Sequence, residues 1–534
     1  MPEAPAIRDS SPVLINVPPV DSFADAAFRH QMGHISRHSL VFFLGTIFTT
    51  ASGYFFKVYL ARALGAEALG IYALGMTVIG LLGVFNAFGL PQAAVRFVAD
   101  YCATARVEML RNFIARAIGL LLLSNLFMGG ILLLIGPRIA ARFYHTAALS
   151  RYFGLFALIM ILGSLTGFLG QVLAGYKDVL RRTVITNFIG TPLMMILAVI
   201  LVMCGLGLRG YILAQVLGAA VVLALLAISV WKLTPAGESS LAAGPFSHLG
   251  KEVISFSAFA FAVNILEFVM AQSDKIMIGH YLNARDVGIY AVAMALVGFV
   301  PIVLQSVNQI FSPVIADLHA RQDQATLRRL FQTLTKWSLG LTLPLAAVMI
   351  IFAPVLMRVF GRDFERGWPI LVIGTIGQLV NCGVGSVGYL LLMSGHQRDL
   401  VRVQVFMAVA TVVLGILLIP KWGILGAAAV AALANLLSNL WYLLEVHRKL
   451  KMFPYNTSYF GLAFPLAGTL GILLLEYRLL DFRSNWILIG FALIAGYAAF
   501  IGIALSSRLD SDDRLILRAI WSQTVGRFVS GGSA

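Results

Sequence analysis

The sequence predicts an all-α membrane protein with about fourteen transmembrane helices, built as two parallel-repeat six-helix lobes plus a C-terminal helix pair. Three observations predict this fold class. Hydrophobic residues make up 59% of the 534 residues and charged residues only 12%, whereas a soluble domain is about 25% charged. Apolar runs of about 20 residues, long enough to cross a bilayer as helices, recur along the whole chain. The third observation is an internal repeat.

The repeat joins residues 57–80 and residues 275–298, which match in register. Both copies contain the letters GIYA, at 70–73 and 288–291, and both begin with a lysine. Self-similarity at a long period fixes the architecture of a chain before any local pattern does. Six expected helices separate the copies, and an even number of crossings gives both halves the same orientation in the membrane.

The expected helices follow the apolar runs in order. In the first lobe they lie near 39–61, 71–95, 112–136, 150–174, 183–206 and 210–231. In the second lobe they lie near 253–279, 288–312, 334–358, 367–394, 402–420 and 424–446, and the final pair lies near 458–477 and 485–506. The chain is therefore expected to begin with a cytoplasmic tail at 1–37, followed by a first lobe at 38–232 and a cytoplasmic linker at 233–252. A second lobe at 253–450, the added helix pair at 451–508 and a second cytoplasmic tail at 509–534 complete it.

Basic residues predict the orientation. Lys and Arg fall about twice as often on the side that holds both ends of the chain, and short loops rich in these residues stay in the cytoplasm. We therefore expect a multi-pass protein of the inner (plasma) membrane with both termini cytoplasmic. The net charge of +15 is then mainly a topology signal, and no nucleic-acid partner is expected, because the basic residues lie in short loops.

The sequence gives little sign of covalent chemistry. It has no Walker-type phosphate-binding loop and no histidine pair with metal-ligand spacing. Its three cysteines are scattered at 102, 204 and 382, which indicates neither a disulfide framework nor a metal site. We expect no enzyme activity and no cofactor, and interpret the chain as a passage for a substrate.

Four passages resemble the Wzx-type polysaccharide flippases, in the polysaccharide-transporter branch of the multidrug/oligosaccharidyl-lipid/polysaccharide exporter superfamily. They are ARALGAEALGIYAL at 61–74, FGLPQAAVRFVADY at 88–101, SDKIMIGHYLNARDVGIYAVA at 273–293 and YLLLMSGHQRDLVRVQV at 389–405. The resemblance covers about residues 38–510 and implies two lobes around a cavity that opens to one side at a time. It also implies that a polyprenyl-diphosphate-linked oligosaccharide is flipped from the inner to the outer leaflet, for exopolysaccharide, O-antigen or lipopolysaccharide synthesis. Membrane lipids and a glycan polymerase are the further partners it implies.

Two lysines are candidates for binding the diphosphate of such a substrate. Lys57 and Lys275 occupy matching places in the repeat, and a lysine binds phosphate as a point charge. The alternative for Lys57 is that its side chain extends to the membrane surface, since it lies about one turn from the expected end of its helix.

A polar face on the helix near 253–279 supplies candidates for coupling. Asn264, Glu267 and Asp274 are spaced to share one helical face. A carboxylate near mid-membrane, such as Glu267, is expected to face water or a partner, because lipid disfavours its charge. The alternatives are a protonated Glu267 in a buried structural hydrogen bond, and an Asp274 that only caps the helix.

Amide side chains complete the candidate site. Gln92, Gln305 and Asn308 are expected to line the cavity, where amides can bond sugar hydroxyls. Their alternative is to join helices to each other, as polar residues commonly do in membranes. Other functions left open are a cation-coupled multidrug exporter of the same fold, a lipid II flippase and, in a different class, a membrane-embedded glycan polymerase or ligase.

Overall fold

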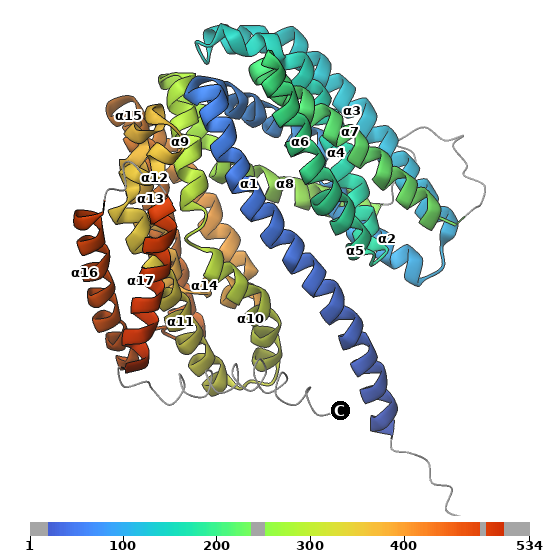
Figure 1. Cartoon of the computed structure of the whole chain (residues 1–534). Coiled ribbons are helices and arrows are strands. Elements are labelled where there is room, and N and C mark those ends of the chain that lie inside the picture. Colours follow the sequence, from blue (N-terminus) through green and yellow to red (C-terminus); the bar gives the residue numbers. More distant parts are fainter. Residues whose placement is uncertain (1–19, 236–250, 481–486, 507–534) are drawn as a thin grey trace, which may run out of the picture.

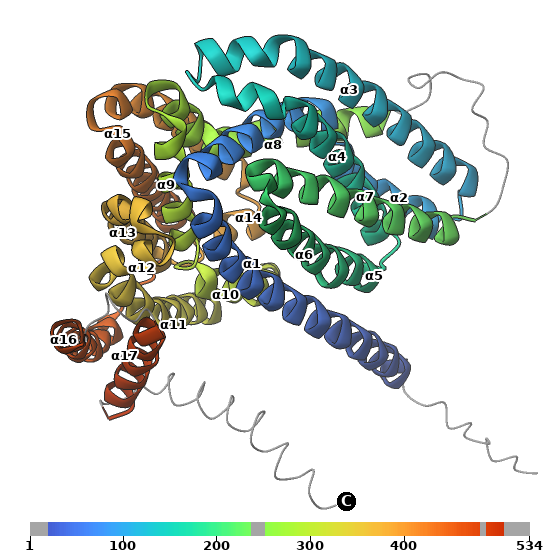
Figure 2. The same cartoon turned by 45° about the horizontal axis from the view of Figure 1, so that its top comes forward.

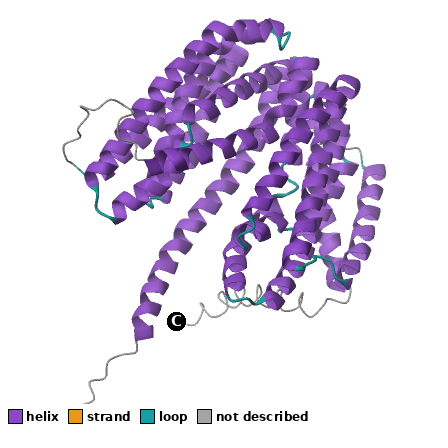
Figure 3. Cartoon of the chain, turned by 180° about the vertical axis from the view of Figure 1, so that it is seen from behind, coloured by secondary structure: helices purple, strands orange, loops and turns teal. Residues whose placement is uncertain are grey.

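The computed structural model of the protein describes residues 20–235, 251–480 and 487–506 (Figure 1). Within these ranges every regular element is a helix, as Figure 3 shows by colour. The predicted all-α fold class is confirmed. The expected tails at 1–37 and 509–534 and the expected linker at 233–252 lie wholly or partly outside the described residues.

The N-terminal lobe contains the first seven α-helices and three short 3₁₀ or π segments. Their bounds are α1 Val20–Ala87, α2 Leu90–Ala103, α3 Val107–Arg142, η1 Ala147–Tyr152, α4 Phe153–Gly175, α5 Val179–Thr183, η2 Val184–Gly190, α6 Thr191–Leu201, η3 Val202–Leu206 and α7 Gly207–Leu233. α1 begins at Val20, well before the expected start at residue 39, so the helix extends into the segment expected as a tail.

The C-terminal lobe starts with α8 and ends with the long helix α15. Its elements are α8 Lys251–Tyr281, α9 Ala284–Val297, α10 Ile302–Ala320, α11 Gln324–Ile351, α12 Ala353–Val359, η4 Arg362–Gly367, α13 Trp368–Val384, α14 Val387–Met393 and α15 Gln397–Leu450. The remaining elements are η5 Thr457–Leu462, α16 Ala463–Leu479 and α17 Ile487–Ser506. The α16–α17 pair packs on α11, where the Tyr497 hydroxyl donates to the Leu341 carbonyl at 2.8 Å.

Glycines divide three of the long helical stretches. Gly65 in α1, Gly205 in η3 and Gly423 in α15 have φ angles of 80°, 84° and 59°. Only glycine adopts such left-handed backbone readily. Gly65 falls between the helices expected at 39–61 and 71–95, and Gly423 falls between those expected at 402–420 and 424–446. Gly205 lies one residue before the end of the helix expected at 183–206, so that break comes slightly earlier than predicted.

Ten helical stretches are long and apolar enough to cross a membrane, or eleven when α9 and α10, which are bent by 51°, count as one span. These helix counts refer to the described residues only. The remaining crossings of the expected fourteen would come from the second arms of the three helices that glycines divide. The chain is a multi-pass membrane protein, and the count of fourteen stays a prediction.

The repeated passages contact each other where the two lobes meet. Gly70 of α1 lies against the Ala284 carbonyl, and Gly288 of α9 lies against the Ala66 carbonyl, so closely that a Cβ at either glycine would overlap that carbonyl. Ala66 and Ala284 match in the repeat, as do the two glycines. The contact is therefore self-complementary, as expected around a pseudo-twofold axis, and small residues allow the backbones to approach this closely.

The arrangement leaves α1 and α8 between the lobes (Figures 1 and 2). The lobes converge where α1 bends at Gly65 and α8 is followed by α9, and we call this the joined end. The first half of α8 packs on α2, with Gly89 against the Ser257 carbonyl. Its second half packs on α1, where Gly279 contacts Leu74. α8 thus contacts both lobes along its length.

Candidate functional site

The two repeat lysines lie near each other at the lobe boundary. Lys57, on the first arm of α1, is exposed, and its ammonium group is close enough to that of Lys275 for the two charges to repel. Lys275, on α8, donates from Nζ to Gln272 Oε1 at 2.8 Å. Neither ammonium group forms an ion pair within the described part of the chain. The boundary therefore holds two positive charges that an anionic ligand could neutralise.

A hydrogen bond between the lobes connects two of the predicted amides. Gln92 Nε2 donates to Asn264 Oδ1 at 3.0 Å, and the bond is exposed. Gln92 is placed by the start of α2, where the left-handed Gly89 (φ 70°) is followed by Pro91 in the first turn. Proline suits this position because the first N–H groups of a helix have no intrahelical acceptor. The structure thus brings together two residues that the sequence predicts separately.

Glu267 is exposed on α8, one turn after Asn264. Among the described residues it makes no ion pair or hydrogen bond. The alternative of a buried structural hydrogen bond is therefore wrong for this residue. Its exposure fits a group that faces water or substrate.

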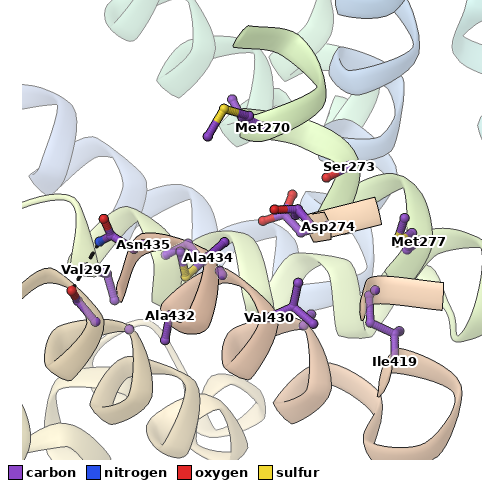
Figure 4. Close-up of a pocket in the computed structure, with 18 of the residues that line it drawn as sticks. Met270, Ser273, Asp274, Met277, Val297, Ile419, Val430, Ala432, Ala434 and Asn435 are labelled. Atoms are coloured by element: carbon purple, nitrogen blue, oxygen red, sulfur yellow. Dashed lines mark hydrogen bonds between the residues drawn. The ribbon is translucent and has the colours of Figure 1, made fainter. Parts of the chain in front are cut away.

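Asp274 has a different environment from Glu267, although the helical spacing predicts a shared face. Its carboxylate accepts from the Tyr290 hydroxyl of α9 at 2.7 Å and from the Lys275 backbone N–H at 2.7 Å. It lines a cavity of about 300 Å³ inside the C-terminal lobe, between α8, α9, α13 and α15 (Figure 4). Asp274 is therefore more than a helix cap.

The wall of this cavity is mostly small and apolar, with a few polar groups. Alanines and glycines of α13 and α15 form much of it, together with Gln378, Thr411, Asn435 and Ser438. Asn435 Nδ2 donates to the Gly377 carbonyl at 3.2 Å, which holds α15 against α13. Hydroxyl, amide and carboxylate oxygens suit a proton, water or a small hard cation.

The amides of α10 separate into two environments. Gln305 is exposed, whereas Asn308 is buried and its Oδ1 has no hydrogen-bond partner in the part of the chain that the structure describes. Asn86, in the second arm of α1, is fully buried and donates to Asn125 Oδ1 at 2.7 Å. That bond holds helices of the N-terminal lobe together, which is the alternative role that the sequence leaves open for such amides.

Comparison with known proteins decides the family. A family model described as "Polysaccharide biosynthesis protein" matches residues 59–366, more than half of the chain. The chain belongs to this family. The match starts at residue 59, two residues after Lys57, and includes the rest of the first copy of the repeat and the whole of the second copy, with Lys275.

Two curated relatives extend this result. An uncharacterised membrane protein of Methanocaldococcus jannaschii is 24% identical over 422 residues, which cover 74% of this chain and 79% of that protein. The probable low-salt glycan biosynthesis flippase Agl15 of Haloferax volcanii is 23% identical over 185 residues, or 34% of this chain and 39% of Agl15.

Solved structures share the fold. The lipid II flippase MurJ, in an inward closed conformation, superposes with a TM-score of 0.69 at 15% identity, covering 91% of this chain and all of that one (100%). A multidrug-resistance MATE transporter of the MOP superfamily, facing inward, gives 0.60 at 15% identity over 76% and 94% of the two chains. The predicted resemblance to the exporter superfamily is confirmed.

Sequence reasoning missed several residues of this family member's candidate site. Tyr290 belongs to the repeated GIYA passage, and its bond to Asp274 was not predicted because a tyrosine in an apolar run suggests core packing. Asn435 and Ser438 carry a detectable signal, since polar residues in the middle of an apolar helix usually face a bundle interior. The roles of Gln215 and His280, discussed below, were also not predicted.

Proposed function

We propose that the protein flips a polyprenyl-diphosphate-linked oligosaccharide from the inner to the outer leaflet by alternating access, for polysaccharide synthesis. The observation that carries this proposal is the pair of unpaired lysines at the lobe boundary of a polysaccharide biosynthesis family member. A diphosphate cannot cross hydrocarbon unaided, because a charge in the bilayer is strongly disfavoured. Lys57 and Lys275 supply compensating charge in the region that both lobes share.

The sugar portion is bound by exposed amides in this proposal. Gln92 and Asn264 already bond each other across the lobes, so a sugar hydroxyl can replace either partner. Gln305, exposed on α10, is a further donor and acceptor. The prenyl chain stays in the lipid, because it needs no polar path.

Coupling is assigned to the carboxylates of α8. Asp274 is the principal candidate, because it lines the cavity of the C-terminal lobe and is held by Tyr290. Glu267 is exposed along the same helix and is a candidate for passing a proton or cation between the boundary and the solvent. The protein acts in the inner membrane with both termini in the cytoplasm, as its basic loops predict, and hands its product to a glycan polymerase.

Complementation of a deletion strain tests this function. We expect the wild-type gene to restore surface glycan, and the strain without it to accumulate a prenyl-diphosphate-linked oligosaccharide at the inner leaflet. Lys57→Ala should restore about tenfold less surface glycan at normal protein level, and Lys57→Arg should partly rescue export because the charge returns. Lys232→Ala, at the exposed end of α7, is the matched control and should complement fully.

Three results would contradict the proposal. Accumulation of lipid II in the deletion strain would point to peptidoglycan synthesis. Drug sensitivity without any glycan defect would point to a multidrug exporter. Full complementation by Lys57→Ala together with Lys275→Ala would show that the substrate anion is bound elsewhere.

A further inference from the structure

Two side chains at the joined end bond backbone carbonyls of the opposite lobe. Arg62 of α1 donates from Nε to the Val359 carbonyl, at the end of α12, at 2.7 Å. His280 of α8 bonds through Nδ1 to the Phe143 carbonyl, just after α3, at 2.8 Å. The first bond runs from the N-terminal to the C-terminal lobe, and the second runs in the opposite direction.

The repeat relates these two contacts. Arg62 and His280 occupy the same position in the two copies, five residues after Lys57 and Lys275. Their acceptors lie at the ends of comparable helical stretches: Phe143 follows α3, and Val359 ends α12, which comes directly after α11. The first two turns of α3 and α11 match in the repeat through Arg111 and Arg329. Two similar contacts therefore cross the lobes in opposite directions, with donors at matching positions and acceptors within two residues of matching, as expected around a pseudo-twofold axis.

The two donors differ in charge behaviour. The Arg62 guanidinium stays charged at every physiological pH, whereas a histidine changes its charge between about pH 5 and pH 8. A carbonyl can only accept, so Nδ1 of His280 must carry a proton in this bond. Protonation of Nε2 then turns a neutral donor into a charged one, and charged donors form hydrogen bonds that are roughly twice as strong.

The surroundings of His280 support a positional role. Its ring stacks on the Phe143 ring, with centroids 4.2 Å apart and planes at 20°. The His145 ring lies 6.3 Å from it. The elements packed at this end also contribute other charged and titratable groups. These are Glu67 of α1, Arg142 of α3, Tyr144 and His145 of the following loop, Tyr281, Arg285, Asp286, Asp363 and Lys421. Among them, Arg285 forms an ion pair with Asp363 at 2.7 Å.

We propose that Arg62 and His280 form a two-point lock that holds the joined end closed, and that His280 makes this lock tighten as the pH on that side falls. Opening of the joined end in the transport cycle must break both bonds, because each crosses from one lobe to the other. The Arg62 bond sets a constant bias toward closure. The His280 bond adds a bias that depends on protonation.

The proposal rests on the alternating-access cycle proposed above, but its test needs no glycan. The purified protein, with its three cysteines replaced, is placed in lipid nanodiscs and spin-labelled at Ala147→Cys and Trp422→Cys, which are exposed in opposite lobes. Electron–electron distance measurements then report the separation of the lobes at the joined end. Failure of this test leaves the flippase assignment untouched, and failure of complementation leaves the lock untouched.

Four proteins, and a fifth that carries both Arg62→Gln and His280→Phe, are compared at about pH 5.5 and about pH 8. In the reference protein we expect the ratio of open to closed joined ends to rise about fivefold at the higher pH, the factor expected when a charged hydrogen bond becomes neutral. His280→Gln keeps a donor that cannot titrate, so the ratio should no longer depend on pH. His145→Gln removes the neighbouring ring and should leave the dependence intact. Arg62→Gln should favour opening at both pH values and keep the same dependence.

Each contrary result overturns part of the proposal. A His280→Gln protein that keeps the pH dependence, or a His145→Gln protein that loses it, removes His280 as the responsive group. An unchanged ratio in Arg62→Gln together with His280→Phe, which keeps the ring but has no donor, removes the lock itself.

Discussion

The same repeated tyrosine has different partners in the two lobes. In the C-terminal lobe the Tyr290 hydroxyl donates to Asp274 at 2.7 Å. In the N-terminal lobe the Tyr72 hydroxyl accepts from Gln215 Nε2 at 2.6 Å, and the position that matches Asp274 in the repeat is Phe56. The two copies of the repeat therefore place different polar groups against the same tyrosine.

The difference extends to the space around each tyrosine. The GLRG passage before Tyr211 matches the GILG passage before Ala427, so that Gln215 matches Ala431. Tyr211 and Gln215 fill the interior of the N-terminal lobe beside Tyr72, with the two tyrosine rings 4.7 Å apart. Ala427 and Ala431 instead line the cavity next to Asp274. Small side chains on α15 thus explain why a carboxylate-lined cavity lies in one lobe.

This comparison separates two roles. The lysines and the glycine contact occur in both lobes, which suits functions that need both lobes together, such as holding a substrate between them and closing one end. Asp274 and its cavity occur in one lobe, which suits a coupling role for that lobe alone. Variants at matching positions can break or sharpen this division.

The largest effect is expected from the shared lysines. Lys57→Ala and Lys275→Ala should each lower glycan export by about tenfold, and together by about 100-fold, because each removes one charge-assisted contact to the diphosphate. Export is measured as surface glycan per unit of membrane-inserted protein. A large effect of one lysine with no effect of the other would contradict a shared binding role.

The symmetric glycine contact should respond equally from either side. Gly70→Ala and Gly288→Ala each place a Cβ against the opposite carbonyl, and such overpacking destabilises by roughly 1–3 kcal/mol. Thermal unfolding of the detergent-purified protein should show a similar loss of stability for both variants. Gly83→Ala, where a Cβ meets nothing within 4 Å, is the control. A loss of stability in only one of the two variants, Gly70→Ala or Gly288→Ala, would contradict a self-complementary interface.

A smaller effect is expected at the matching tyrosines. Tyr290→Phe removes the donor to Asp274 and should lower transport about fivefold, the equivalent of one hydrogen bond of about 1 kcal/mol. Tyr72→Phe removes a bond to Gln215 in the N-terminal lobe and should leave the transport rate near normal. Equal losses of transport rate in both variants would show that Tyr72 of the N-terminal lobe also takes part in coupling.

The sequence predicts the fold class well, because the hydrophobic composition and the internal repeat are properties of the whole chain and do not depend on any single contact. Apolar runs without charge can only be membrane helices, and the GIYA passages at Gly70 and Gly288 mark the two halves. Helix starts are less predictable. α1 continues through residues 20–38, which contain no proline. The bend between α9 and α10 falls at Pro301, the N-cap of α10.

The candidate site is predicted less completely. Repeat symmetry gives Lys57 and Lys275 matching positions. Helix spacing predicts one face for Asn264, Glu267 and Asp274, of which Asn264 bonds across the lobes and Asp274 lines the cavity. Spacing on one helix cannot reveal what packs against it, so the bond from Gln92 and the cavity beside Asp274 depend on neighbours that only the fold supplies. His280 was overlooked because its acceptor is a backbone carbonyl, which leaves no mark in a sequence.

We propose that coupling resides in the C-terminal lobe, at Asp274. The most direct test reconstitutes the protein in proteoliposomes and measures flipping of a prenyl-diphosphate-linked oligosaccharide with and without an imposed proton or Na⁺ gradient. Asp274→Asn, which keeps the shape and a hydrogen-bond acceptor for Tyr290, should lose the stimulation by the gradient, a reduction of roughly tenfold in the driven rate. Tyr72→Phe should keep it. Full stimulation in Asp274→Asn would contradict the account and move the coupling group away from this cavity.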